Sequence, residues 1–329
     1  MEETLQTIQL RKNARRDFFR MGIALLALGA VYVAGQYLFL YLWQWLCGIS
    51  PAIAGASWGK WAVTFVPLYL IAMPVCWLLM RRVPAEDLPQ SKLGGKRFAV
   101  LMIMCFPIMY GGNIVGTLLS LLLSGGSAQN NLVGYLDSSL LSVLVAVVIA
   151  PCLEEVFFRK LLIDRCGKYG EKTAIILSGL TFGLFHMNLF QFFYAFGLGL
   201  IFAYVYTRTR RLRYSIIMHM IINFLGTVVA PWILSLLNSD ALMAMQTGDL
   251  TALMDILPGL IVYMLYAFAL IGLSIAGLVL LIVKRKKFVL QPASQELPKQ
   301  RRVRTVYGNV GMILFILFCL GMTAYTLLA

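Results

Sequence analysis

The sequence predicts an all-α fold, a polytopic bundle of about eight or nine transmembrane helices, and its composition and hydropathy are the first indications. Of the 329 residues, 60% are hydrophobic and only 13% are charged, and the mean hydropathy is +0.82. A membrane-spanning helix needs roughly 20 mainly apolar residues, and such stretches follow one another along the chain with short polar interruptions. This pattern leaves no room for a soluble catalytic domain. The net charge of +14 does not indicate nucleic-acid binding, because the basic residues form short clusters at the ends of apolar stretches.

Nine apolar stretches are the candidate spans, and each is long enough or nearly long enough to cross a bilayer. They cover residues 18–47, 60–80, 98–124, 138–160, 173–188, 190–207, 214–236, 257–283 and 306–328. Within the third, the Gly-Gly-Asn sequence at 111–113 predicts a kink.

The chain divides into four predicted regions on this basis. They are a basic cytoplasmic tail at 1–17, N-terminal transmembrane helices at 18–137, a helical core with the candidate site at 138–236, and C-terminal transmembrane helices at 237–329. The last region contains a basic loop at 284–304, for which we expect contact with anionic lipid headgroups.

The orientation follows from the distribution of basic residues, because cytoplasmic loops accumulate Lys and Arg. With nine spans, 27 of the 28 Lys and Arg residues fall on the side of the N-terminus, and Lys60 is the exception. We therefore expect an integral protein of a bacterial cell membrane with a cytoplasmic N-terminus and an external C-terminus. A reporter fused after residue 329 should be external, and one inserted near residue 290 should be cytoplasmic. The opposite result at either position would contradict the span count.

Function is best sought among polar residues inside the spans, since an ionisable group at membrane depth costs about 2.5 to 3.5 kcal/mol unless it faces a polar interior. The fourth span ends with Glu154, Glu155 and Arg159. Glu155 and Arg159 are four residues apart and share a helix face, whereas Glu154 is rotated by about 100°. We expect Arg159 to neutralise Glu155 and Glu154 to face a cavity. Pro151, one turn earlier, predicts a kink before the two carboxylates.

The fifth and seventh spans contain the two histidines of the chain. Gly179, Gly183 and His186 follow one face of the fifth span, a pattern that permits close helix contact, and Phe182 should pack beneath the imidazole. The seventh span carries Ser215, His219, Asn223 and Gly226 in one narrow stripe. Lipid would disfavour each of these faces, so we expect the three helices to converge.

Two carboxylates, two imidazoles and a carboxamide in one cavity can form a hydrolytic site. A partly desolvated carboxylate is a strong base toward water, one histidine can share that water or its proton, and an asparagine with the other histidine can donate hydrogen bonds to an oxyanion. A Cys152 nucleophile is disfavoured. The same polar residues are also compatible with contacts that only hold helices together. They are compatible as well with a transporter, a class that usually shows repeated halves with broken helices.

The order of these motifs resembles the CPBP family, the CAAX prenyl protease and bacteriocin-processing (Abi) intramembrane proteases. The motifs are the segment from Glu154 to Arg159, Phe182 to His186, and His219 to Asn223, and the resemblance covers roughly residues 138–230. It implies a conical catalytic cavity between helices 4, 5 and 7 and cleavage of a membrane-associated or lipidated protein or peptide. The implied roles are water activation for Glu154 and His186, oxyanion stabilisation for His219 and Asn223, and support from Glu155, Arg159 and Phe182. Some members of such a family act without cleavage, so a binding, immunity or scaffold role is the alternative.

A metal ion is the open question for this site, because the family is often described as metalloproteases. A zinc ion would use Glu154, Glu155, His186 and His219, but the spacing differs from the HExxH pattern, and Asn223 is a poor zinc ligand. If both glutamates bound metal, no obvious carboxylate would remain as the base. We therefore predict no obligatory cofactor, with zinc as the alternative. The expected partners are a membrane peptide or protein substrate and the lipid bilayer, with no nucleic acid.

If all helices are straight, the candidate site residues would lie at different depths in the membrane. At 1.5 Å per residue, Glu155 would lie about 6 Å from Arg159 and His219 about 9 Å from Arg213, but His186 would lie about 21 Å from Lys172. Either the fourth helix continues past Arg159 into the cytoplasm and the fifth begins outside the bilayer, or the fifth is strongly tilted. Both alternatives predict a site in the cytoplasmic half of the membrane.

Overall fold

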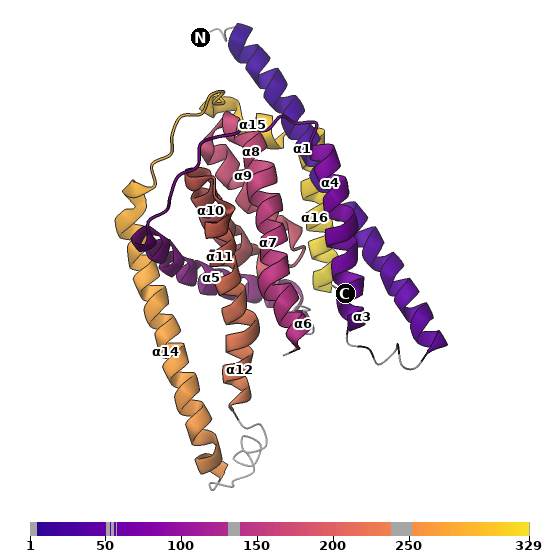
Figure 1. The fold of residues 1–329 in the computed structure, drawn as a ribbon, viewed down its shortest axis with the longest axis vertical. Helices are drawn as coiled ribbons and strands as arrows, with labels where there is room; N and C mark the ends of the chain where they lie inside the picture. The colour runs from indigo at the N-terminus through magenta and orange to yellow at the C-terminus, as the bar shows by residue number, and fades with distance from the viewer. Residues whose placement is uncertain are drawn as a thin grey trace.

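The computed structural model describes residues 5–50, 53, 56, 58–130, 139–237 and 252–328, and its regular elements in these ranges are all helical. Eight helices there are long and apolar enough to cross a membrane, which confirms the prediction of an all-α polytopic bundle. They pack as one bundle in which α5 lies obliquely to its neighbours (Figure 1).

The α-helices, in chain order, are α1 (Leu5–Ile49), α3 (Trp58–Phe65), α4 (Met73–Met80), α5 (Gly95–Leu123), α6 (Leu140–Val143), α7 (Ala150–Glu155), α8 (Leu162–Cys166), α9 (Glu171–Phe185), α10 (Leu189–Thr209), α11 (Leu212–Phe224), α12 (Ala230–Ser235), α14 (Ala252–Lys284), α15 (Arg302–Tyr307) and α16 (Val310–Leu328). The π-helical segments are η1 (Val66–Ala72), η3 (Leu144–Ile149), η4 (Val156–Leu161) and η6 (Leu225–Val229). Short 3₁₀ turns are η5 (Gly167–Tyr169), η7 (Arg285–Lys287) and η8 (Lys299–Arg301).

The first helix is longer than the predicted span at 18–47. It begins at Leu5, so the described part of the basic segment expected as a tail is helical and continuous with the span. Asp17 is buried where this helix meets the end of the fourth span. Its carboxylate accepts a hydrogen bond from the Tyr169 hydroxyl at 2.7 Å and pairs with Lys168 Nζ at 3.2 Å. These contacts fix the N-terminal helix to the core.

The fourth span also continues beyond its predicted end at residue 160. It runs without a break from Leu140 to Tyr169. This supports the alternative in which the fourth helix continues past Arg159 into the cytoplasm. The added turns are held by Asp164, which accepts hydrogen bonds from Tyr206 at 2.9 Å and from Arg210 at 3.0 Å. Tyr206 lies at the end of the sixth predicted span, and Arg210 follows it. Because these partners are distant in sequence, hydropathy alone could not locate the helix end.

Helix α9 differs from the prediction of a full span at 173–188. It has 15 residues, a length of roughly 22 Å, and is not among the eight helices long enough to cross a bilayer alone. It packs along α10 in the opposite direction, and Arg208 at the end of α10 pairs with Glu171 at the start of α9 at 3.1 Å. The predicted close contact is confirmed, since a Cβ atom at Gly183 would lie 3.1 Å from the backbone of Phe196.

Helix α5 continues through residues 111–113, from Gly95 to Leu123, so the Gly-Gly-Asn sequence does not end the helix, and the predicted kink stays a prediction. The glycines serve helix contact instead. A Cβ atom at Gly112 would lie 2.6 Å from both the N and Cα atoms of Tyr194 in α10, whereas one at Gly111 would meet no atom within 4 Å. Gly112 is therefore the position at which α5 can approach the backbone of α10.

We expect Gly112→Ala to lower the free energy of unfolding by about 1 to 3 kcal/mol, because the new methyl group would meet backbone that cannot rotate away. Gly111→Ala is the matched control, and it should be neutral or stabilising by up to about 1 kcal/mol, since alanine favours the helix and the position is open. Thermal unfolding of both purified variants in the same detergent checks this difference. Equal stability of the two variants would contradict the assigned contact.

Candidate active site

A cavity of about 400 Å³ is lined by four of the five residues predicted as catalytic and by Phe182, which was predicted as a support. Glu154, His186, His219 and Asn223 all line it, so the three polar helix faces converge as expected. The prediction that only the fourth, fifth and seventh spans enclose the cavity is incomplete, however. Residues of α1, η1, α10 and α16 also line the cavity, including Gln36, Tyr69, Gln191 and Thr326. Helices outside the recognisable motifs therefore form much of its wall.

Glu155 lies behind the cavity wall and is fully buried with Arg159, which confirms the ion pair expected from their spacing. Arg159 binds both carboxylate oxygens, through Nε and Nη2, at 3.0 Å each. Its Nη1 donates to the hydroxyl of Ser178 in α9 at 2.9 Å, and its guanidinium carbon lies 4.6 Å from the centre of the Phe182 ring. This pair therefore joins the fourth span to α9.

His219 connects the buried glutamate to the one in the cavity. Its Nδ1 lies 3.2 Å from Oε1 of Glu155, and its Nε2 lies 3.9 Å from Oε2 of Glu154. A carboxylate paired with arginine only accepts hydrogen bonds, so Nδ1 of His219 carries the hydrogen. In the neutral ring, Nε2 is then an unprotonated nitrogen directed toward Glu154. The Glu155 to His219 contact was not predicted from the sequence.

His186 is oriented by its own helix. Its Nδ1 lies 2.7 Å from the carbonyl oxygen of Phe182, an acceptor, so Nδ1 donates and Nε2 of the neutral ring is left as the acceptor. The Phe182 ring packs against the imidazole edge to face, with ring centres 4.9 Å apart and an angle of 89° between planes. The predicted packing of Phe182 is confirmed. The same ring also contacts His219 at 5.6 Å, so it separates and positions both imidazoles.

Glu154 is partly accessible, with 17% of its side chain exposed. Its Oε1 accepts a hydrogen bond from the hydroxyl of Tyr69, a buried residue of the second span, at 3.2 Å. Sequence reasoning missed Tyr69, because a tyrosine in an apolar span is an ordinary packing residue and its partner lies 85 positions away. The two glutamates thus have different surroundings: Glu155 is neutralised by arginine, and Glu154 faces the cavity beside a hydroxyl donor.

Asn223 has a structural contact that its predicted role did not include. Its Nδ2 donates to the backbone carbonyl of Ala146 in η3 at 2.8 Å. A carboxamide has two N–H donors, so one remains for a bound group. The asparagine therefore fixes the seventh predicted span to the fourth, close to the cavity.

π-Helical turns surround this cavity, where the sequence predicted only a proline kink. Segment η3 ends two residues before Pro151, and η4 begins directly after Glu155. Tyr69, Ala146 and Thr227, from η1, η3 and η6 respectively, all line the cavity. Short π-helical insertions in α-helices are frequent at functional sites, and here they coincide with the predicted one.

The proposed zinc set does not fit this arrangement. Both oxygens of Glu155 are engaged, one by Arg159 alone and the other by Arg159 and His219. Among the residues that the structure describes, no three His, Cys, Asp or Glu side chains are grouped as a metal site. Glu155 acts as a partner of Arg159 and His219, so the four-residue set cannot form without breaking a buried ion pair.

Comparisons with known proteins support a specific family. Residues 136–225 match the family described as type II CAAX prenyl endopeptidase Rce1-like. The chain is 27% identical over 174 residues to the Bacillus subtilis protein named "Putative membrane peptidase YdiL". The aligned region covers 50% of this chain and 69% of that protein. It is 39% identical over 103 residues to "Membrane-embedded CAAX protease MroQ" of Staphylococcus aureus, covering 29% of this chain and 39% of that protein. No solved structure gives a significant match.

Proposed function

We propose that this chain, whose residues 136–225 match the Rce1-like family model, is a membrane protease of the CPBP type, an intramembrane endopeptidase that uses water activated by Glu154 and His186. Its substrate would be a membrane-associated or lipidated protein or peptide. The observation that carries this proposal is the different surroundings of the two adjacent glutamates. Glu155 is buried and paired with Arg159, whereas Glu154 lies in a cavity together with two imidazoles.

In the proposed reaction, a water molecule is held by a Glu154 oxygen and by Nε2 of His186. Glu154 takes a proton from the water while the water oxygen attacks the carbonyl carbon of the scissile bond. The carbonyl oxygen becomes the oxyanion of a tetrahedral intermediate. Glu154 then returns the proton to the departing amine nitrogen, the C–N bond breaks, and the products are a carboxyl and an amine terminus.

The oxyanion would be stabilised by the free N–H of Asn223 and by Nε2 of His219. The second contribution requires His219 in its doubly protonated form, because Nδ1 already donates to Glu155. Tyr69 would orient Glu154 through its hydroxyl. Preorganised donors of this kind typically contribute about 2.7 to 4 kcal/mol each to the lowering of a barrier.

The test of the function is a comparison of membrane and secreted peptides by mass spectrometry in cells that contain wild-type protein or Glu154→Gln. Asp87→Asn is the matched control, because it removes an exposed carboxylate outside the cavity. Fragments present with wild type and Asp87→Asn but absent with Glu154→Gln support the enzyme. An unchanged peptide profile together with a retained phenotype would support a non-proteolytic binding or scaffold role instead.

We also expect cleavage without an obligatory metal ion, because Glu154 is free to act as the base and Glu155 is held by Arg159. Active purified protein should therefore keep its activity after exhaustive chelation, with elemental analysis of the same sample as the reference measurement. Stoichiometric zinc whose removal abolishes cleavage and whose return restores it would overturn this expectation.

A further inference from the structure

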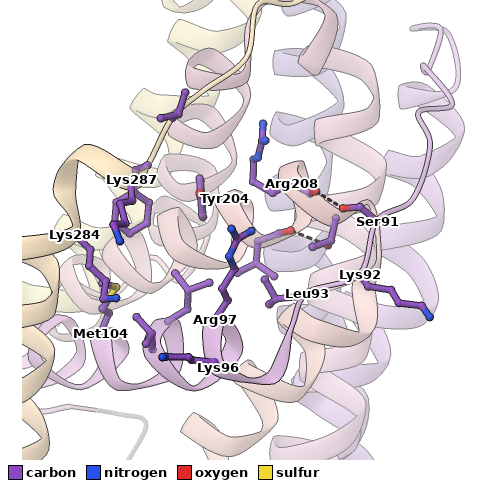
Figure 2. Close-up of a pocket in the computed structure, with 16 residues that line it drawn as sticks. Ser91, Lys92, Leu93, Lys96, Arg97, Met104, Tyr204, Arg208, Lys284 and Lys287 are labelled. Carbon is purple, nitrogen blue, oxygen red and sulfur yellow. Dashed lines mark hydrogen bonds between the residues drawn. The ribbon is translucent and has the colours of Figure 1, made fainter.

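A second pocket, of about 460 Å³, lies away from the candidate active site. It is formed by the segment that leads into α5 with the first turns of α5, by the end of α10, and by the end of α14 with the residues that follow it (Figure 2). These three regions are far apart in sequence. Six basic side chains line it: Lys92, Lys96, Arg97, Arg208, Lys284 and Lys287. The described lining contains no acidic residue.

Most of these positive charges are not neutralised by the protein. Arg208 pairs with Glu171 at 3.1 Å. The other five lining cations make no hydrogen bond or ion pair with any residue that the structure describes. Like charges gathered around one concave surface repel one another and attract an anion. The pocket therefore has the electrostatic character of an anion-binding site.

The rest of the lining is mainly apolar, which narrows the chemistry of the anion. Leu93, Val100, Leu101, Met104 and Phe288 lie beside the cations. Along the membrane-spanning part of α14 that leads to the pocket, apolar side chains are exposed, including Leu278, Val279 and Ile282. A small inorganic anion would use only the charged rim. An amphiphile would use both parts, with its anionic group among the cations and its hydrocarbon along α14 and α5.

The ends of membrane-spanning helices are also where a lipid headgroup lies. Basic pockets between transmembrane helices bind anionic lipid headgroups. We propose that this pocket binds the phosphate-bearing headgroup of an anionic phospholipid, with its acyl chains on the apolar surfaces of α5 and α14. The bound lipid would connect α14 to α5 and α10. This proposal is independent of the proposed proteolysis.

The test uses the full chain purified in detergent and native mass spectrometry of intact protein–lipid complexes. Phosphatidylglycerol, phosphatidylcholine, inorganic phosphate and a glutamate-rich peptide are titrated separately. The pocket variant carries Lys96→Gln, Arg97→Gln and Lys284→Gln. The control variant carries Lys12→Gln, Arg15→Gln and Arg16→Gln, which removes the same charge from exposed positions outside the pocket and outside the basic loop at 284–304. Thermal unfolding of each variant verifies that it is folded.

We expect wild type and the control variant to bind phosphatidylglycerol more tightly than phosphatidylcholine, and the pocket variant to lose on the order of a hundredfold in phosphatidylglycerol affinity. Equal losses in the two variants would overturn the proposal, since they would indicate a general effect of net charge. Tighter binding of inorganic phosphate or of the acidic peptide than of phosphatidylglycerol would also overturn it. If the triple variant does not fold, Lys284→Gln alone replaces it, with Lys12→Gln as its control.

Discussion

Glu154→Gln is expected to lower the rate of peptide-bond cleavage by about two to four orders of magnitude, while folded protein accumulates close to the wild-type level. Glutamine retains the size of the side chain and an acceptor for the Tyr69 hydroxyl, but it cannot take a proton from water. Glu154 faces the cavity and pairs with no arginine or lysine among the residues that the structure describes, so its neutralisation leaves no buried charge behind there. Cleavage of a substrate identified by peptide mass spectrometry, measured at equal amounts of purified protein, gives the rate.

The accompanying control is Asp87→Asn, which should cleave at the wild-type rate. Thermal unfolding in detergent separates a catalytic defect from a folding defect. Cleavage by Glu154→Gln within a factor of a few of wild type would exclude this side chain as the base, and the proposed reaction with it.

Glu155→Gln is expected to act mainly on stability, lowering the free energy of unfolding by about 3 to 5 kcal/mol. Arg159 would keep its charge in a place where neither it nor Glu155 has any solvent exposure. His219 would lose the carboxylate that fixes its ring. Both the amount of folded protein in membranes and the cleavage rate per folded molecule should therefore fall, and detergent-solubilised thermal unfolding measures the first effect.

The double variant Glu155→Gln with Arg159→Met distinguishes a lost charge pair from general intolerance at this position. Removing both charges should restore part of the stability that Glu155→Gln loses, since no unpaired buried charge remains. It should not restore full activity, because His219 still lacks its partner. Equal folding losses in Glu154→Gln and Glu155→Gln would contradict the division of roles between the two glutamates.

Much of the fold could be predicted because burial in a membrane leaves a direct mark on composition. The long apolar helices were found, and the errors occur where tertiary contacts replace lipid. Helix α9 can be short because other helices surround it. The fourth span continues to Tyr169 because its polar end has partners on other helices: Tyr169 donates to Asp17, and Asp164 accepts from Tyr206. Neither effect can be derived from the hydropathy of a single segment.

Prediction of the candidate site from the sequence was limited in a similar way. Convergence of Glu154, His186, His219 and Asn223 could be predicted, because each is polar in an apolar helix and lipid would disfavour it. Tyr69 could not, since nothing in its own segment distinguishes it from a packing tyrosine. The amide of Asn223 and the Nδ1 of His219 also contact groups 77 and 64 positions away, which only the folded arrangement specifies.

The π-helical turn η3 controls which of two chemically identical side chains reaches the cavity. In an α-helix, successive residues are rotated by about 100°, which is also the angular separation of Glu154 and Glu155. A π-helical turn accommodates one additional residue without ending the helix. Suppose that one residue were deleted from η3 while the helix before it stayed in place. Each later residue of the helix would then take the position of the residue before it. Glu155 would then stand where Glu154 does now and would line the cavity in its place. The glutamate that we propose as the base is therefore selected by a backbone feature that precedes it by only one or two helical turns.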